Sequence, residues 1–171
     1  IMPHQHFGNA DSAITIDLDA IIANWRYIDG LSAPRTKTAA VVKANGYGLG
    51  SCMVATALAR AGCELFFVAS LAEAIELRAE FRQTGHCDLS IMVLHGIQRG
   101  QEKDFTAHRL EPVLNDLEQI SRWQLYASKT GKTLRALLHF DTGMTRLGLD
   151  NDQANWLIQN RQALNGMKIS Y

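Results

Sequence analysis

Short apolar runs alternate with amphipathic segments along the chain, and this alternation predicts a succession of strands and helices. Six runs are rich in Val, Ile, Leu or Phe, and several lack a strict in–out alternation, which is typical of parallel strands buried on both faces. These predicted strands are residues 38–42, 65–69, 89–94, 110–114, 134–140 and 167–171. A further strand, residues 13–18, is predicted before the first helix, and Pro112 predicts that the 110–114 strand is short or irregular.

Between the strands, apolar residues recur at helical spacing in segments that begin at a capping residue and end at glycine. Ser70 and Glu73 have the S-x-x-E spacing of a capping box, ahead of a segment that ends at Gly85. The other predicted helices begin at Asp19, Ser51, Asp116 and Asn151 or Asp152, end by Gly30, Gly62, Gly131 and Gly166, and are joined by a brief helix within residues 96–107. This order predicts βα units around a parallel sheet, either an open doubly wound sheet or an incomplete (β/α)8 barrel.

Composition narrows the class of protein without deciding its function. The 171 residues include 17 basic and 17 acidic side chains and are 47% hydrophobic, which is typical of a soluble globular domain and gives no electrostatic argument for binding nucleic acid or a membrane surface. The three cysteines form neither a C-x-x-C pair nor a metal-ligand spacing, and residues 1–12 lack the pattern of a secretory signal. A reduced, cytoplasmic protein is therefore expected.

A lysine at the end of the first core strand is the strongest chemical signal in the sequence. Lys43 follows Ala40-Val41-Val42 and precedes a glycine-rich turn that runs to Gly50. In parallel α/β folds reactive groups gather at the carboxyl ends of strands, where partial desolvation favours the neutral, nucleophilic form of an amine. An ordinary exposed lysine is the alternative interpretation. The glycines match neither a P-loop nor a dinucleotide-binding fingerprint.

Three segments, in this order, resemble the alanine racemase family. Residues 40–50, AVVKANGYGLG, resemble the family's cofactor-lysine segment, and residues 141–148, DTGMTRLG, resemble its D-[ST]-G-M-x-R-[LIV]-G segment. Residues 16–21, with Asn24 after them, resemble the family's start. The resemblance implies an α/β fold, a (β/α)8 TIM-type barrel that is incomplete here with about six strands, and an absent C-terminal β domain. It divides the chain into an N-terminal arm, residues 1–12, and a partial barrel domain, residues 13–171.

The resemblance also implies an activity and its residues. The family interconverts L- and D-alanine, which supplies D-alanine for peptidoglycan, with pyridoxal 5′-phosphate as cofactor. Lys43 would hold the cofactor as a Schiff base and act as acid and base on one face of the substrate carbon. Tyr47 would hydrogen-bond the phosphate, and Arg146 would reach the substrate carboxylate and the cofactor's phenolic oxygen. Packing for Tyr47 and a surface position for Arg146 are the alternatives, and Asp141 is interpreted as a turn residue.

Two expectations concern what the resemblance leaves open. In the family a tyrosine of the partner subunit is the second base, so a homodimer is expected for the intact protein and no racemase activity for this fragment alone. Where many family members carry a carbamylated lysine that pairs with the arginine, this chain has His139. Histidine cannot form that carbamate, and we therefore predict a small anion, or failing that an ordered water, between His139 and Arg146.

Three other classes of protein remain as alternatives. The pyridoxal-phosphate homeostasis proteins share the barrel and its lysine, but they lack both the tyrosine four residues later and the segment at residues 141–148. Decarboxylases on the same barrel are disfavoured for the same reason. A doubly wound domain with no cofactor is the third alternative.

Overall fold

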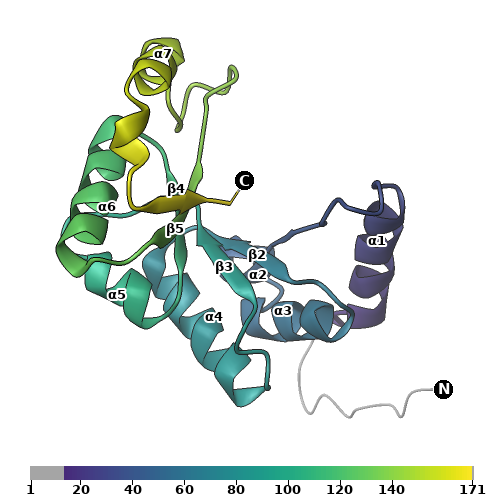
Figure 1. Ribbon diagram of the computed structural model, residues 1–171. Helices are drawn as coiled ribbons and strands as arrows, with labels where there is room; N and C mark the ends of the chain where they lie inside the picture. The colour runs from purple at the N-terminus through teal and green to yellow at the C-terminus, as the bar shows by residue number, and fades with distance from the viewer. Residues whose placement is uncertain (1–13, 171) are drawn as a thin grey trace.

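The computed structural model describes residues 14–170 and contains a six-stranded parallel sheet whose strands follow one another in sequence order (Figure 1). The strands are β1 (Ala40–Val41), β2 (Leu65–Val68), β3 (Ser90–Val93), β4 (Glu111–Leu114), β5 (Leu134–Leu138) and β6 (Met167–Ile169). Each strand pairs in parallel with the next one along the chain. Parallel neighbours need a crossover connection, and a helix lies between each pair of consecutive strands.

The helices are α1 (Leu18–Gly30), α3 (Ser51–Arg60), α4 (Leu71–Gln83), α5 (Glu102–Ala107), α6 (Leu117–Thr130) and α7 (Asn151–Gln159), with a 3₁₀ turn, η1 (Arg161–Leu164), before β6. Four of the helices, α1, α4, α6 and α7, begin at a residue whose side chain caps the first turn. The capping box predicted from Ser70 and Glu73 is confirmed at the start of α4, and the side chain of Asp116 caps α6 as predicted. Figure 1 shows α3, α4, α5 and α6 following one another along one side of the sheet.

The packing on the two faces of the sheet decides between the two predicted architectures. Against one face, strand residues such as Phe66 and Ile91 pack with helix residues such as Leu77 and Trp123 in the main core. On the other face a smaller cluster consists of strand and strand-end side chains alone: Leu65, Met92, Val113 and Leu137, with Ala39, Phe67 and Leu94 packed against them. A doubly wound sheet carries helices on both faces. The fold is therefore the partial (β/α)8 barrel, and the smaller cluster is its interior.

The start of the chain differs from the predicted strand at residues 13–18. Residues 14–17 are not part of a strand, and Ala13 lies outside the described residues. The carboxylate of Asp17 accepts a hydrogen bond from the Ala20 amide at 3.0 Å, so α1 begins at Leu18 and Asp19 lies in its first turn. The prediction was wrong because a local cap outweighed the apolar alternation of this segment.

The last βα unit also differs from the prediction. Asp150 caps α7 through a hydrogen bond from the Gln153 amide at 2.8 Å, in place of Asn151 or Asp152. The predicted single helix up to Leu164 is instead α7 followed by η1. The N-cap residue of α3 is Gly50 in place of the predicted Ser51, so that helix has no side-chain cap. By contrast β4 is a four-residue strand in spite of Pro112, which pairs in register with Val93.

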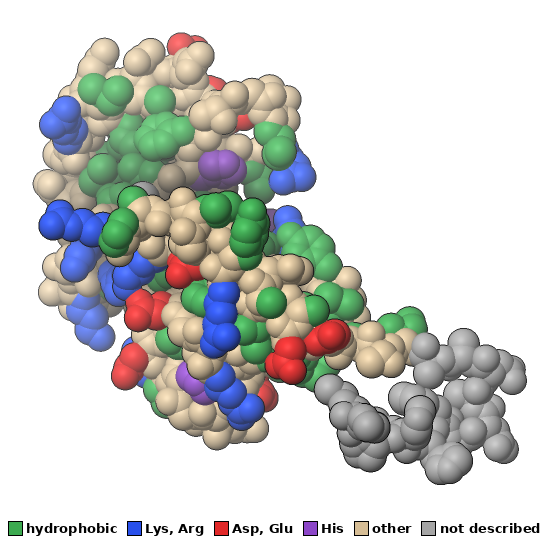
Figure 2. Space-filling model, turned by 90° about the vertical axis from the view of Figure 1, so that its right-hand side faces the viewer, with side chains coloured by type: hydrophobic (Ala, Val, Ile, Leu, Met, Phe, Trp, Pro, Cys, Tyr) green, Lys and Arg blue, Asp and Glu red, His purple; other side chains and the backbone are tan. Residues whose placement is uncertain are grey.

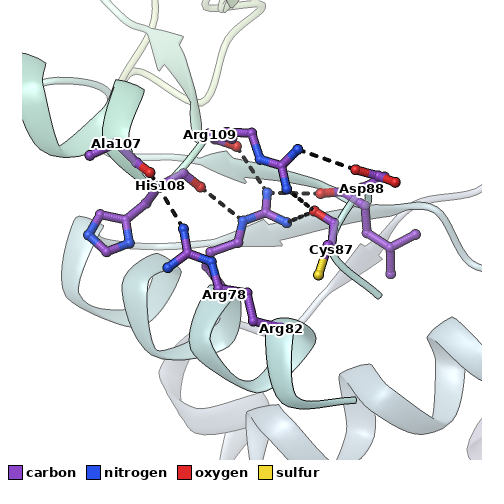
Figure 3. Close-up of polar contacts among 8 residues, drawn as sticks. Arg78, Arg82, Cys87, Asp88, Ala107, His108 and Arg109 are labelled. Carbon is purple, nitrogen blue, oxygen red and sulfur yellow. Dashed lines mark hydrogen bonds and ion pairs between the residues drawn. The ribbon is translucent and has the colours of Figure 1, made fainter. Parts of the chain in front are cut away.

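A buried arginine joins the segments that enter β3 and β4 (Figure 3). Arg78, on α4, is only 1% exposed, and its guanidinium donates hydrogen bonds of 2.9–3.0 Å to the backbone oxygens of Cys87, Leu89, His108 and Arg109. Burial lowers the pKa of Arg78, and the nearby charges of Arg109 and Arg82 lower it further. Four oriented carbonyl groups thus take the place of a carboxylate partner.

The three cysteines have free thiols and are buried or half-buried. Cys63 is buried, which raises the pKa of its thiol to about 11, while Cys52 and Cys87 are half-buried. Within residues 14–170 no helix has the length and apolar character needed to cross a membrane. Figure 2 shows hydrophobic side chains at the surface among charged ones; the exposed apolar residues include Val41, Tyr47 and Met144.

Candidate active site at the carboxyl ends of the strands

Lys43 lies at the carboxyl end of β1, at the start of the turn that leads to α3. The Val42 amide donates to the Phe67 oxygen at 2.8 Å, so pairing with β2 continues to the residue before Lys43. Side chains alternate between faces along a strand, and Ala39 belongs to the interior cluster while Val42 belongs to the outer core. The backbone leaves the extended conformation at Val42, and Lys43 is half-buried directly after it. Its ammonium group makes no hydrogen bond or ion pair with any residue in 14–170.

The turn after Lys43 is left-handed. Ala44, Asn45, Gly46, Tyr47 and Gly48 all have positive φ angles, between 52° and 88°, in the segment labelled α2 (Lys43–Tyr47). L-residues in this conformation cost about 1–2 kcal/mol each, so the segment needs support from elsewhere. Gly46 is required for a second reason, since a Cβ there would lie 3.1 Å from the Ser51 nitrogen.

Hydrogen bonds within the segment supply part of that support. The Gly46 amide donates to the Val42 oxygen at 2.9 Å, and the Gly50 amide donates to the Asn45 oxygen at 2.8 Å. The side-chain oxygen of Asn45 accepts from the Ser51 amide at 3.0 Å, which joins the turn to the start of α3. Tyr47 projects from this turn and is 63% exposed, so its hydroxyl is available to a bound group.

One carboxylate outside the segment also holds it. Glu73, on α4, accepts the Ala44 amide at 2.8 Å through Oε1 and the Ala69 amide at 2.7 Å through Oε2. Oε2 also accepts the Ser70 amide at 3.3 Å as part of the capping box. The sequence predicted only the capping role of Glu73. The contact with Ala44 depends on the pairing of β1 with β2, which no local pattern reveals.

A polar network joins the carboxyl ends of β3, β4 and β5. The amide nitrogen of Asn115 donates to the backbone oxygens of Leu94 and Val113, both at 2.9 Å, so its oxygen faces His139 Nδ1 at 2.8 Å. Because a carbonyl oxygen only accepts, Nδ1 of His139 carries the hydrogen. Nε2 is the nitrogen left for another partner: it accepts when the ring is neutral and donates when the ring is protonated. The sequence analysis did not identify Asn115 as a site residue. The one feature that could have indicated it is its position directly after a strand.

Arg146 lies on an exposed loop between β5 and α7. Phe140 and Leu149 pair as an isolated bridge that closes the base of this loop. Asp141 accepts hydrogen bonds of 3.0 Å from the Gly143 and Thr145 amides, which confirms its interpretation as a turn residue. Arg146 itself is exposed and makes no hydrogen bond or ion pair within residues 14–170. The structure therefore brings Lys43 and Tyr47 together on one turn and places Arg146 on a separate loop.

Two cavities lie at opposite ends of the sheet. One of about 480 Å³ lies at the carboxyl ends of β2 to β4, where Ser70, His95, Asp116 and Gln119 line it and Leu147 reaches it from the 141–148 loop. The other, about 560 Å³, lies at the amino-terminal ends of the strands, and none of the three predicted site residues lines either of these two cavities. The smaller cavity lies at the end of the sheet where an active site is expected, because barrels of this type place their sites at the carboxyl ends of the strands.

Residues 16–171 match the family model for the alanine racemase N-terminal domain. The chain belongs to this family. The catabolic alanine racemase of Agrobacterium fabrum is 43% identical over 171 residues, which are all of this chain and 43% of that protein. The alanine racemase of Brucella ovis is 44% identical over 95% of this chain and 40% of its own length.

The solved structures agree with this assignment and confirm the predicted barrel. The alanine racemase from Bartonella henselae, a structure with covalently bound pyridoxal phosphate, superposes with a TM-score of 0.83 at 38% identity. The match covers 91% of this chain and 42% of that one. The chain thus spans about two fifths of the length of the relatives it matches. The family and the fold are confirmed, while the individual roles of Lys43, Tyr47 and Arg146 stay predictions.

Proposed function

We propose that this chain is the cofactor-binding barrel portion of a pyridoxal-phosphate-dependent racemase that acts on alanine. The observation that carries the proposal is the Lys43 amine, which has no partner in residues 14–170 and lies at the carboxyl edge of a barrel of the alanine racemase family. Relatives named alanine racemase, 43–44% identical over at least 95% of the chain, favour a racemase over a pyridoxal-phosphate homeostasis protein or a decarboxylase.

The side chains of the site fit an anionic, phosphorylated aldehyde. Lys43 supplies a nucleophilic amine, Tyr47 a hydroxyl donor on the same turn, and Arg146 a guanidinium suited to a carboxylate or phenolic oxygen. When bound, pyridoxal phosphate would accept the electron pair of the substrate's Cα–H bond, as it does generally. Lys43 would then take and return the Cα proton on one face, and Arg146 would orient the substrate carboxylate.

The opposite face of the substrate needs its own acid–base group, because a racemase returns the proton from the other side. We assign that group to the partner subunit of a homodimer, and we expect the 171-residue chain alone not to interconvert the enantiomers of alanine. A cytoplasmic enzyme that supplies D-alanine to the cell wall belongs to the same proposal. The anion predicted between His139 and Arg146 also stays a prediction: protonated His139 would offer it Nε2–H.

Covalent trapping tests the site. The chain is incubated with pyridoxal phosphate, reduced with borohydride and mapped by peptide mass spectrometry. We expect the adduct on Lys43, its loss in Lys43→Ala, and its retention in Lys132→Ala, a control at the other end of the sheet. Label spread over many lysines, or absent from Lys43, would overturn the proposal. Racemisation of alanine by this chain alone, at rates typical of the family, would contradict the assignment of the second base to a partner.

A further inference from the structure

Glu73 is the one side chain of α4 whose hydrogen bonds join that helix to the turn that carries Lys43. Its Oε1 accepts the Ala44 amide at 2.8 Å, and this amide nitrogen belongs to the peptide that follows Lys43. Its Oε2 accepts the Ala69 amide at 2.7 Å at the end of β2. A single carboxylate therefore ties together the carboxyl ends of two neighbouring strands.

This contact acts where the backbone is under strain. The left-handed run starts at Ala44, with φ 52° and ψ 49°, so the peptide between Lys43 and Ala44 is the point at which the chain leaves the strand. The hydrogen bonds of the run include those of the Gly46, Gly48, Leu49 and Gly50 amides, whereas the Ala44 amide donates to the Glu73 carboxylate. Hydrogen bonds to a charged acceptor contribute more than neutral ones, typically about 1.5–3 kcal/mol.

We propose that Glu73 is the positioning residue for Lys43: its carboxylate fixes the Lys43–Ala44 peptide and so sets the direction in which the lysine leaves β1. The inference rests on the proposed function of Lys43, and it deepens that function by adding a residue that touches neither cofactor nor substrate. Glu73 is the third residue of α4, and its carboxylate also closes the capping box of that helix. The carboxylate is therefore itself held in place by a rigid element.

Two substitutions separate positioning from capping. Ser70→Ala removes the hydroxyl that accepts the Glu73 amide but leaves the Glu73 carboxylate on Ala44 and Ala69. Glu73→Ala removes both roles. Glu73→Gln keeps one acceptor oxygen and replaces the other with an NH₂ group, so it can accept either the Ala44 amide or the Ala69 amide but not both. This milder substitution is included in case Glu73→Ala does not fold. Glu76→Ala, on the exposed face of the same helix, is the control.

Amide hydrogen exchange by NMR, without cofactor, is the first measurement. In Glu73→Ala we expect exchange of the Ala44 amide to accelerate at least about tenfold, the equivalent of a lost hydrogen bond to a carboxylate. Ser70→Ala and Glu76→Ala should leave that amide within about twofold while Ser70→Ala loosens the first turn of α4. In Glu73→Gln we expect faster exchange of either the Ala44 amide or the Ala69 amide. Unchanged protection of Ala44 in both Glu73 variants would overturn the proposal.

The rate of borohydride-trapped labelling of Lys43 is the second measurement. We expect Glu73→Ala to slow it about tenfold, in line with the lost hydrogen bond, and Ser70→Ala to leave it unchanged. Equal slowing in both variants would show that Glu73 acts only by capping α4. If the unaltered chain does not label at Lys43, the proposed function fails, while the exchange of Ala44 still decides whether Glu73 holds the turn.

Discussion

Asp141 organises the loop that carries Arg146 by accepting backbone hydrogen bonds from within that loop. The Thr145 and Gly143 amides donate to its carboxylate at 3.0 Å. The hydrogen bond from Thr145 is the main cause that lowers the pKa of Asp141, and the one from Gly143 adds to it. The carboxylate is exposed to solvent, so its effect is on the local order of the loop.

Acid should therefore loosen this loop before the rest of the fold. The pKa of Asp141 is lower in the folded chain than its ordinary value of about 3.9. Ionised Asp141 thus stabilises the loop above that ordinary value, and the contribution is lost as the pH falls through the lower, folded pKa. We expect the Gly143 and Thr145 amides to lose protection in that window, while Asp141→Asn is loosened at neutral pH. Equal acid sensitivity in Asp141→Asn would contradict this role.

Among the elements, α4 makes long-range polar contacts at two places along its length. Its first turn holds the strand ends through Glu73, and its middle holds the entries to β3 and β4 through Arg78. Arg78 is a buried cation whose partners are carbonyl groups. A side chain with fewer donors would therefore leave some of these buried oxygens without a hydrogen bond.

Arg78→Lys should destabilise the chain even though it keeps the charge. An ammonium group has three donors and lacks the planar fork that reaches four carbonyl groups. We expect the free energy of unfolding to fall by roughly 2–4 kcal/mol, as measured by urea denaturation. Arg82→Lys is the matched control, because Arg82 is exposed and donates to one carbonyl at 3.5 Å. Similar losses in the two variants would show that Arg78 contributes no more than an exposed arginine.

The whole molecule is an arc of a barrel with two free strand edges. Within residues 14–170, β1 pairs only with β2 and β6 pairs only with β5. The interior is layered: Arg135 and Glu111 pair at 3.2 Å near the amino-terminal end, apolar residues fill the middle, and His139 and Asn115 meet near the carboxyl end. Lys43 follows β1 at the same, carboxyl-terminal edge of the sheet.

Free edges predict that the 171-residue chain associates when it is studied alone. Unpaired N–H and C=O groups on an edge strand are templates for pairing with another chain. We expect sedimentation to show association that grows with concentration, and Val41→Lys, which places a charge on the β1 edge, to reduce it. Met53→Lys is the control, since Met53 is equally exposed, at 47% against 44%, but lies on α3. A monomer at all concentrations would contradict the prediction.

Local sequence patterns were sufficient to predict the order of β1 to β6 with helices between them, the caps at Ser70 and Asp116, and the place of Lys43 at a strand end. These features depend on side-chain periodicity and on neighbours within four residues, which act in the same way in any fold. Periodicity did not separate a barrel from a doubly wound sheet, because apolar runs look alike whichever layer covers them; the barrel was predicted from the resemblance of the motifs.

The support of the site depends on contacts between residues that are far apart in the sequence. Glu73 and Ala44 are 29 residues apart, and Asn115 and His139 are 24 apart, so these contacts exist only once parallel pairing has brought successive strand ends to one edge. The left-handed turn also depends on a distant contact. Its conformational cost arises locally, but the Glu73 carboxylate on α4 helps to offset that cost by accepting the Ala44 amide. Register between strands, rather than any local pattern, sets these contacts.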